Sequence, residues 1–405
     1  MSWDEVPLRR IFRIVNGGTP TSDEQYWEGN VSWATPVDIG SVDGKYLNST
    51  QRSLTKAGVL TGSRTVPGGS LVLSTRAPIG YVAQTGMTMA FNQGCRGLVP
   101  TVPADTRYFR YQLLALREEL VSRGAGSTFM ELSTDALAAV PVIRPPLDEQ
   151  RRIADFLDAE TARIDGLIRV ISESSNLLQA KRRALLMSAF PDHGCTTARL
   201  GYYLNLVTSG PRGWGDYVRS QGTPFFRSAN LRRDEIEPNL EDLALVDPPL
   251  STAAETARSR VRIGDVLIGI TGANTGWVSL ADQRIAQANV SQHVCLVRPS
   301  NLIDGRWLAY ALSAPQVQEL LLGSQYGGTK TQLSLGDIRN LVMPLPSLDE
   351  QHEIVAAITE GLAAITAERA LRDRQLTLLS ERRQALITAA VTGQIDVTTA
   401  QGVAV

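Results

Sequence analysis

Side chains that could carry out catalysis are few in this sequence of 405 residues. Gly323–Thr331 approaches a phosphate-binding loop, but its lysine stands one place late and the preceding residues read as a helix, where such a loop needs a strand. The stretch 247–250 (Asp-Pro-Pro-Leu) approaches the Asp-Pro-Pro-aromatic tetrapeptide of adenine methyltransferases, but Leu250 replaces the aromatic residue that would stack on an extruded base. Neither segment is taken as a catalytic motif.

Metal-binding and nucleophilic residues are equally scattered. His193 and Cys195 would supply only two ligands, which do not make a metal site, and His293 and His352 stand alone. The three cysteines form no Cys-x-x-Cys pair, which argues against a disulfide framework or a cysteine zinc site. We find no Gly-x-Ser-x-Gly motif and no glycine-rich turn for S-adenosylmethionine. The chain is therefore expected to position a partner, with no catalysis, cofactor or metal of its own.

The chain does offer side chains that can hydrogen-bond base edges or phosphates, as amides, guanidinium groups and ammonium groups do. The candidates for DNA contact are Lys45, Arg52, Lys56, Arg64, Arg76, Asn92, Gln93, Arg227, Asn230, Arg258, Arg260, Gln292 and Lys330. For any single one, an ordinary surface position is the alternative. With 40 basic and 41 acidic residues, the net charge of −1 predicts weak DNA binding through electrostatics alone. Strong binding would then require a partner protein that adds contacts.

An internal repeat organises the whole sequence. Residues 145–150 (Pro-Pro-Leu-Asp-Glu-Gln) match residues 346–351 (Pro-Ser-Leu-Asp-Glu-Gln) at an offset of 201. Other matches keep the same order, with offsets that fall to 192–199 upstream, as insertions would cause. They pair 33–39 with 225–231, 69–73 with 264–268, 93–100 with 292–299, 128–133 with 329–334 and 182–186 with 383–387. The chain is predicted to be two copies of one unit, about 1–195 and 196–405.

Each copy begins with a region in which short apolar runs alternate with glycine and proline turn signals, which predicts a mainly β domain. A long helix follows, with apolar residues every seven positions. The stripe consists of Leu157, Ile164, Ile171, Leu178 and Leu185 in the first copy and Ile358, Ile365, Leu379 and Leu386 in the second, where Arg372 interrupts it. Such a seam predicts a coiled coil about 60 Å long. The alternative is a helix packed on its own globular domain.

Two matched helices in one chain favour antiparallel pairing with each other, which would give a pseudo-twofold molecule. The predicted class is α+β, with two mainly β domains separated by two long helices. The predicted boundaries are domain 1 at 1–143, a helical spacer at 144–195, domain 2 at 196–343, a second helical spacer at 344–396 and a tail at 397–405.

Composition limits the class and location of the protein. Hydrophobic residues make up 43% and charged residues 20%, which fits a folded protein with sizeable cores. No apolar run approaches the length of a membrane span, and the first residues do not resemble a secretory signal. Together with the isolated cysteines, these features predict a cytoplasmic protein without a membrane partner.

Two similar domains on a rigid spacer suit a linear target in two parts, and double-stranded DNA is the natural candidate. Half-sites read from one face of DNA lie about 34–36 Å apart, a distance that helices of this length can bridge. Because the two domains are similar but not identical, the two half-sites are expected to differ.

The combined motifs resemble the specificity subunit of type I restriction-modification systems. In the first copy the matching stretches are 17–20, 26–27, 33–39, 74–80, 92–94 and 126–129, and in the second they are 264–268, 291–294 and 328–334, with both Leu-Asp-Glu-Gln helix starts. The resemblance implies two target-recognition domains on an antiparallel coiled coil. It implies two modification subunits that bind S-adenosylmethionine and methylate adenine, and restriction subunits that use ATP and Mg²⁺. Arg76 has no counterpart in the second copy, so any phosphate contact it makes is not duplicated.

Motifs shared by family members that read different sequences cannot encode the sequence that is read. Specificity is therefore expected in the segments between motifs, such as 41–66, 211–222 and 232–262. Two other interpretations stay open at this point. One is an adenine methyltransferase with fused recognition domains, which would need the missing cofactor motif. The other is a coiled-coil scaffold that binds only proteins.

Overall fold

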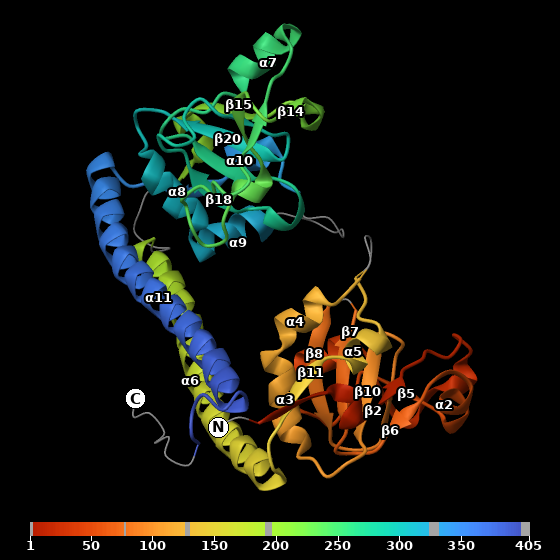
Figure 1. Cartoon of the computed structure of the whole chain (residues 1–405). Coiled ribbons are helices and arrows are strands. Elements are labelled where there is room, and N and C mark those ends of the chain that lie inside the picture. Colours follow the sequence, from red (N-terminus) through yellow and green to blue (C-terminus); the bar gives the residue numbers. More distant parts are fainter. Residues whose placement is uncertain (1–2, 77, 126–129, 191–196, 324–331, 398–405) are drawn as a thin grey trace. The chain divides into compact units, whose positions relative to one another are not determined.

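The computed structural model describes residues 3–76, 78–125, 130–190, 197–323 and 332–397 (Figure 1). The chain forms two compact units, the first made of residues 1–172 and 374–405 and the second of residues 173–373. Each unit contains one mainly β head, together with part of each of the two long helices, α6 (Leu147–Ala189) and α11 (Leu348–Val391). The helices therefore belong to both units, and each unit is described by itself.

The head of the first unit contains three small sheets and five short helices among its described residues. Its strands are β1 (Asp4–Pro7), β2 (Phe12–Asn16), β3 (Trp27–Ala34), β4 (Tyr46–Leu47), β5 (Arg52–Leu54), β6 (Thr65–Val66), β7 (Leu71–Thr75), β8 (Ile79–Thr85), β9 (Met89–Phe91), β10 (Cys95–Pro100) and β11 (Pro141–Arg144). Its helices are α1 (Pro36–Ser41), α2 (Lys56–Gly62), α3 (Thr106–Ala115), α4 (Arg117–Ser122) and α5 (Thr134–Ala138). Figure 1 shows α3 and α4 beside the sheet that contains β8.

The head of the second unit follows a similar plan. Its strands are β12 (Thr197–Arg199), β13 (Leu204–Ser209), β14 (Val218–Arg219), β15 (Thr223–Phe226), β16 (Ala244–Val246), β17 (Val266–Gly269), β18 (Val278–Leu280), β19 (Asn289–Val290), β20 (Val294–Pro299) and β21 (Val342–Pro344). Its helices are α7 (Ala253–Arg258), α8 (Gly305–Ser313), α9 (Pro315–Gly323) and α10 (Leu335–Asn340).

The strand orders of the two heads correspond, which confirms the predicted duplication at the level of topology. The main sheet has the order β2-β10-β7-β8-β4 in the first head and β13-β20-β17-β18 in the second. A two-stranded sheet closes each head, β1-β11 and β12-β21 respectively. The third sheet of each head contains one parallel pair, β3 with β9 and β15 with β19, in otherwise antiparallel surroundings.

The two long helices run antiparallel, as predicted. In the first unit, Leu157 of α6 shares a core with Ile387 of α11, and eight residues further along α6, Asp165 bonds Arg383 with an Oδ1–Nε distance of 3.1 Å. Along this contact the residue number rises in α6 and falls in α11, so the two helices are antiparallel. In the second unit, α6 residues Leu178 and Leu186 share a core with Ile358, Leu362 and Ile365 of α11.

The predicted seam is buried over most of its length. Leu157, Ile164, Leu178, Ile358 and Ile365 are at most 7% exposed. The remaining members of the stripe, Ile171, Leu185, Leu379 and Leu386, are partly buried. Each helix also packs on a head. Ile153 and Leu157 of α6 share a core with helix α3 of the first head, and Ile358 of α11 shares a core with helix α8 of the second head. The two alternatives drawn from the sequence are therefore combined in one arrangement.

The glutamine of each Leu-Asp-Glu-Gln motif joins a helix start to its head. Gln150 accepts a hydrogen bond from the Asp105 amide (3.0 Å) and donates to the Pro145 carbonyl (2.8 Å). Gln351 accepts from the Asp304 amide (2.8 Å) and donates to the Pro346 carbonyl (2.9 Å). Both side chains are almost fully buried, so their polar groups must be paired. This motif therefore stabilises the fold and fixes the angle at which each helix leaves its head.

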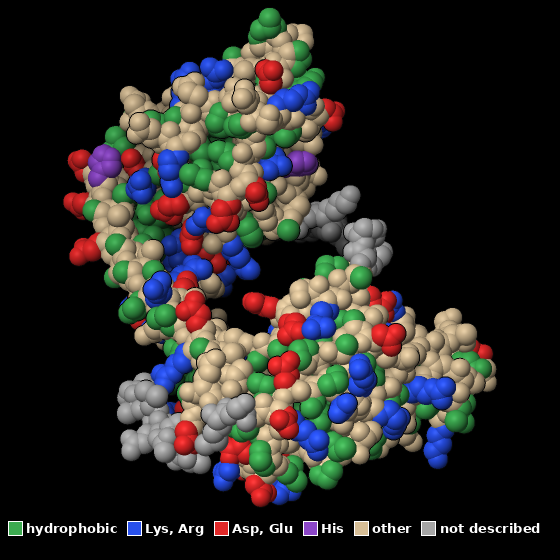
Figure 2. Space-filling view, viewed as in Figure 1, with side chains coloured by type: hydrophobic (Ala, Val, Ile, Leu, Met, Phe, Trp, Pro, Cys, Tyr) green, Lys and Arg blue, Asp and Glu red, His purple; other side chains and the backbone are tan. Residues whose placement is uncertain are grey.

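Basic and acidic side chains are mixed on the surface of both units, as Figure 2 shows for one face. Among the described residues, none of the helices is long and apolar enough to cross a membrane.

Candidate nucleic-acid interface

Three of the predicted DNA contacts meet at one end of the main sheet in the first head. Arg76 follows β7, and Asn92 and Gln93 lie in the turn that connects β9 with β10. The Thr75 amide donates to the Gly94 carbonyl (2.8 Å), which holds the end of β7 against this turn. The turn itself is fixed by the Gly94 amide, which donates to Asn92 Oδ1 (3.0 Å). Arg76, Asn92 and Gln93 thus form a first polar cluster, which we call the first reading cluster.

The second head builds its equivalent cluster from other side chains. The Ile270 amide donates to the His293 carbonyl (3.0 Å), at the place where the first head pairs Thr75 with Gly94. Thr271 Oγ1 lies 2.6 Å from His293 Nδ1, and Gln292 Nε2 lies 3.0 Å from His293 Nε2. Thr271, Gln292 and His293 form the second reading cluster.

Only Gln292 of this second cluster was among the sequence candidates. His293 stood alone in the sequence, and Thr271 occupies the position at which Arg76 has no counterpart. The signal that could have found them is the repeat, because offsets of 195 and 199 align Thr271 with Arg76 and His293 with Gly94.

The charge of the first reading cluster is partly compensated. Arg76 Nη1 lies 3.7 Å from Glu131, and Arg96 Nη2 lies 3.4 Å from the same carboxylate. Arg76 also forms a β-bridge with Glu131, and Thr271 forms one with Gln332, so the chain returns to the cluster at the same place in both heads. The predicted contact Lys330 lies outside the described residues.

The other basic candidates of the first head lie elsewhere. The Arg52 guanidinium stacks over the ring of Trp27 at 3.6 Å from its centroid, a cation–π contact, with Trp33 at 5.6 Å. Lys56 begins α2 and Arg64 follows that helix, and both are exposed. Lys45 pairs with Asp165 of α6 at 2.9 Å. Lys45 therefore contacts the helix in this structure and is a weak candidate for DNA contact.

In the second head, Asn230 is fully buried and is better explained by the fold than by DNA. Its Oδ1 accepts from the Arg227 amide (2.9 Å), and its Nδ2 donates to the Asn239 carbonyl (3.0 Å). The equivalent residue of the first head, Asp38, makes the same bond to the amide of Thr35 (2.9 Å). Asn230 is therefore not a candidate for DNA contact, because a side chain without exposed polar atoms cannot reach a base.

The remaining candidates of the second head each contact a neighbour. Arg227 donates to the Asp242 carbonyl (3.0 Å), Arg258 bonds the Thr208 hydroxyl, and Arg260 bonds Gln287 (3.4 Å). Arg258 and Arg260 are exposed and remain available to phosphates.

The described residues contain no group of three or more histidine, cysteine or acidic side chains that could hold a metal ion. Cys95 and Cys295 are buried in the heads. Burial raises the pKa of the Cys95 thiol far above its ordinary value and raises that of Cys295 to about 12. Both side chains are therefore neutral thiols near pH 7, with little of the thiolate that nucleophilic chemistry needs.

The comparisons with known proteins agree with this architecture. A family profile described as "Type I restriction modification DNA specificity domain" matches residues 1–171 and 254–374. A specificity subunit of the type I restriction enzyme MjaIX, from Methanocaldococcus jannaschii, is 26% identical over 98% of this chain and 94% of its own length. The EcoBI specificity subunit of Escherichia coli is 23% identical over 97% of this chain and 80% of its own length.

Solved structures show the same fold. A chain from a structure that describes the assembly and conformational transition of a type I R-M system superposes with a TM-score of 0.74, at 17% identity. That match covers 97% of this chain and 98% of the other. The HsdS subunit of Thermoanaerobacter tengcongensis gives a TM-score of 0.50 at 19% identity, covering 97% of both chains. The duplicated heads, the antiparallel helices and the profile match together show that this chain belongs to the type I restriction-modification DNA specificity family.

Proposed function

We propose that this chain recognises a bipartite, asymmetric DNA sequence, with each head reading one half. The observation that carries this proposal is the duplication of one scaffold with two different reading clusters. Amide side chains at the same turn, Gln93 and Gln292, can form paired hydrogen bonds with a base edge. Their neighbours differ, since Arg76 stands where the other head has Thr271. Two different half-sites follow from two different sets of donors and acceptors.

The antiparallel helices serve as the spacer in this proposal. At about 1.5 Å per residue, α6 with 43 residues spans about 64 Å, which exceeds one turn of DNA. The boundaries expected from the sequence fit this division of labour: heads at 1–143 and 196–343, and helical spacers at 144–195 and 344–396, followed by a tail at 397–405.

The helices also offer a surface for partner subunits. Val170 and Leu177 of α6 are 58% and 69% exposed, and Leu371 and Leu378 of α11 are 60% and 48% exposed. The two pairs are related by the repeat offset of 201, so each helix carries the same apolar pair outside the seam. A duplicated site implies two copies of one partner. We assign these sites to two modification subunits, which would bring S-adenosylmethionine and methylate adenine, in a cytoplasmic complex.

Restriction subunits, with their ATP and Mg²⁺, would complete the assembly. The relatives that span nearly the whole chain are named specificity subunits, which favours this proposal over a fused methyltransferase. Calorimetry on the isolated chain should accordingly show no micromolar binding of S-adenosylmethionine or ATP.

Methylome sequencing with and without this gene, in cells that carry its neighbouring modification gene, tests the proposal. Adenine methylation at one bipartite motif should disappear when the gene is deleted. Unchanged methylation, with the chain still bound to other proteins, would instead support a protein scaffold.

As a test of docking, Leu177→Asp with Leu371→Asp should release the modification subunit without unfolding the chain. The matched control is Asp at two exposed polar positions, Ser172 and Arg374.

A further inference from the structure

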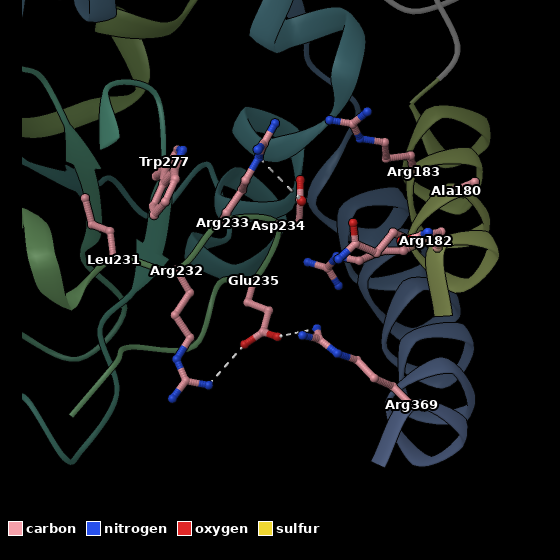
Figure 3. A pocket seen from close by; sticks show the side chains of 12 residues that line it. Ala180, Arg182, Arg183, Leu231, Arg232, Arg233, Asp234, Glu235, Trp277 and Arg369 are labelled. Carbon is pink, nitrogen blue, oxygen red and sulfur yellow. Dashed lines mark hydrogen bonds and ion pairs between the residues drawn. The ribbon is translucent and has the colours of Figure 1, made fainter. Parts of the chain in front are cut away.

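A groove of about 730 Å³ lies in the second unit, between the head and the two long helices (Figure 3). Five arginines line it: Arg182 and Arg183 of α6, Arg232 and Arg233 of the head, and Arg369 of α11. Two acidic residues, Asp234 and Glu235, also line it. The lining side chains therefore carry a formal net charge of +3, in a protein whose net charge is −1.

The two acids are already engaged by three of the arginines. Glu235 lies 3.1 Å from Arg369 and 3.2 Å from Arg232, and Asp234 lies 3.9 Å from Arg233 (Figure 3). Arg182 is different. Its side chain is partly buried, and its Nε and Nη2, which are closed off from solvent, donate to no protein group among the described residues.

The surroundings of Arg182 favour an anion from outside the chain. Burial lowers the pKa of its guanidinium, and the negative charges of Glu237, Asp234 and Glu235 act in the opposite direction. Its neighbour Arg183 is exposed, and no ion pair is found for it among the residues described. The exposed guanidinium of Arg183, beside the partly buried positive charge of Arg182, is suited to hold a phosphate oxygen pair in this groove.

In the first unit, the arginine equivalent to Arg182 is neutralised by a carboxylate of the chain itself. The repeat offset of 201 aligns Arg182 with Arg383, and Arg383 bonds Asp165 at 3.1 Å. The residue of the second copy that aligns with Asp165 is Thr366, so the second copy lacks this carboxylate. The same offset aligns Arg183 with Gln384, a neutral side chain that donates to the Leu114 carbonyl (3.4 Å). Both differences make the second unit more positive.

The groove and the second reading cluster share the hairpin formed by β17 and β18. Trp277 lines the groove, and its carbonyl accepts from the Gly269 amide (2.9 Å) across the β17–β18 hairpin. Thr271 of the reading cluster lies in the turn of the same hairpin. Asn274 of that turn donates to the Ser228 carbonyl (2.8 Å), next to the segment that carries Arg232 and Arg233. The groove and the second reading cluster are thus both built in part on the β17–β18 hairpin.

We infer that this arginine groove binds the phosphate backbone of DNA beside the second half-site, through Arg182 and Arg183, and that the first unit has no equivalent contact. The inference rests on the proposed function and adds an asymmetry to it. The second head gains a contact that carries no sequence information, whereas the first head must rely on its own surface and on partners.

The salt dependence of DNA binding by the full chain tests this inference. Two unrelated duplexes of ~30 base pairs serve as probes, with anisotropy measured from about 50 to about 200 mM salt. Arg182→Gln with Arg183→Gln should weaken binding equally for both duplexes. The slope of log K against log salt should become less negative by about 1–2, since each phosphate contact contributes about 0.9. Arg383→Gln, the matched control, should leave the slope unchanged.

A reciprocal pair of variants sharpens the test. Thr366→Asp places in the second copy the carboxylate that the first copy has, and should reproduce the loss seen in the double variant. Asp165→Thr removes that carboxylate from the first copy, and should make the slope steeper. Melting curves of all variants separate these effects from unfolding.

An unchanged slope in the Arg182/Arg183 double variant would overturn the inference and leave the proposed function intact. The same holds if that variant keeps its DNA binding but no longer copurifies with the modification subunit, because the groove would then hold an acidic protein segment. If neither the chain nor its complex with the modification subunit binds any duplex, the proposed function fails, and the inference fails with it.

Discussion

In the first head, Asn92, Gln93 and Gly94 form a turn beside Arg76, whereas in the second head Ser291, Gln292 and His293 form the same turn beside Thr271. The backbone bond that holds each turn is the same, 2.8 Å from Thr75 to Gly94 and 3.0 Å from Ile270 to His293. The backbone of the turn is therefore the same in both heads, while the polar side chains on it differ. Such a separation lets one fold read different sequences without losing stability.

Residues that the two copies share stabilise the fold at the same places. The Leu132 amide donates to the Thr75 carbonyl (2.8 Å) and the Leu333 amide to the Ile270 carbonyl (2.9 Å). The serine that follows each leucine caps the next helix, α5 or α10, with its hydroxyl. The shared motifs thus explain the common architecture, and under the proposed function the unshared positions determine the sequence that is read.

Exchanging a whole head should produce the largest effect. A chain in which residues 1–143 come from a relative should read a new first half-site and keep the second half and the gap between them. The physical reason is that each head has its own core and its own reading cluster. Methylome sequencing of the hybrid measures both halves at once. A change in both half-sites would show that the heads do not act independently.

Shortening both long helices should alter the gap between the half-sites. Deleting residues 171–177 of α6 with 370–376 of α11 removes one heptad from each antiparallel partner and keeps the seam in register. Seven residues correspond to about 10 Å, or about three base pairs of DNA. Because the deletion also removes Leu177 and Leu371 of the partner surface, the chain is tested without partner subunits, and its preferred gap should shrink accordingly in a selection from randomised duplexes. Deleting the heptad from α6 alone is the control, and it should impair assembly.

The two reading-cluster glutamines should each affect one half-site only. Gln93→Ala should relax the preference at one base pair of the first half, and Gln292→Ala at one base pair of the second. Loss of a paired hydrogen bond to a base typically costs about 1–3 kcal/mol, or about 5–150-fold in discrimination. Competition binding with singly substituted duplexes measures this. Equal relaxation in both halves by either variant would contradict the assignment of one cluster to each head.

The smallest expected effect concerns the buried glutamines at the helix starts. Gln150→Ala and Gln351→Ala should each destabilise the chain by about 1–3 kcal/mol, because a backbone amide and a backbone carbonyl lose their partner. Thermal unfolding should show similar decreases for both variants. Glu353→Ala, at an exposed position of α11, provides the control. Unequal decreases would mean that the two junctions are not equivalent.

The repetition in the sequence made much of the fold predictable. Matched motifs at nearly constant offsets imply matched structures, and the heptads of α6 identified the seam because helix periodicity links spacing to burial directly. The antiparallel pairing followed from the duplication. Arg372, which interrupts the heptads of α11, is tolerated because it pairs with Glu368 one turn away.

The candidate site was less predictable, because residue type alone does not tell an exposed amide from a buried one. Asn230 has the chemistry of a base contact but fixes a turn inside the head. Lys45 has the charge of a phosphate contact but pairs with α6. His293 meets Thr271 only through the pairing of distant strands, and the arginines of the groove come from three segments that meet only in the fold.

The composition of the first core has a consequence for synthesis. That core includes Ile387, Ala390 and Val391 from the end of α11, and the Tyr108 hydroxyl donates to the Val391 carbonyl (3.1 Å). On the ribosome, these residues appear after the whole of the second unit, which is continuous at 173–373. The head that is translated earlier is therefore completed later. A chain released after residue 373 contains the whole second unit but lacks the α11 residues of the first core, so under the proposed function such a truncation should impair the reading of the first half-site.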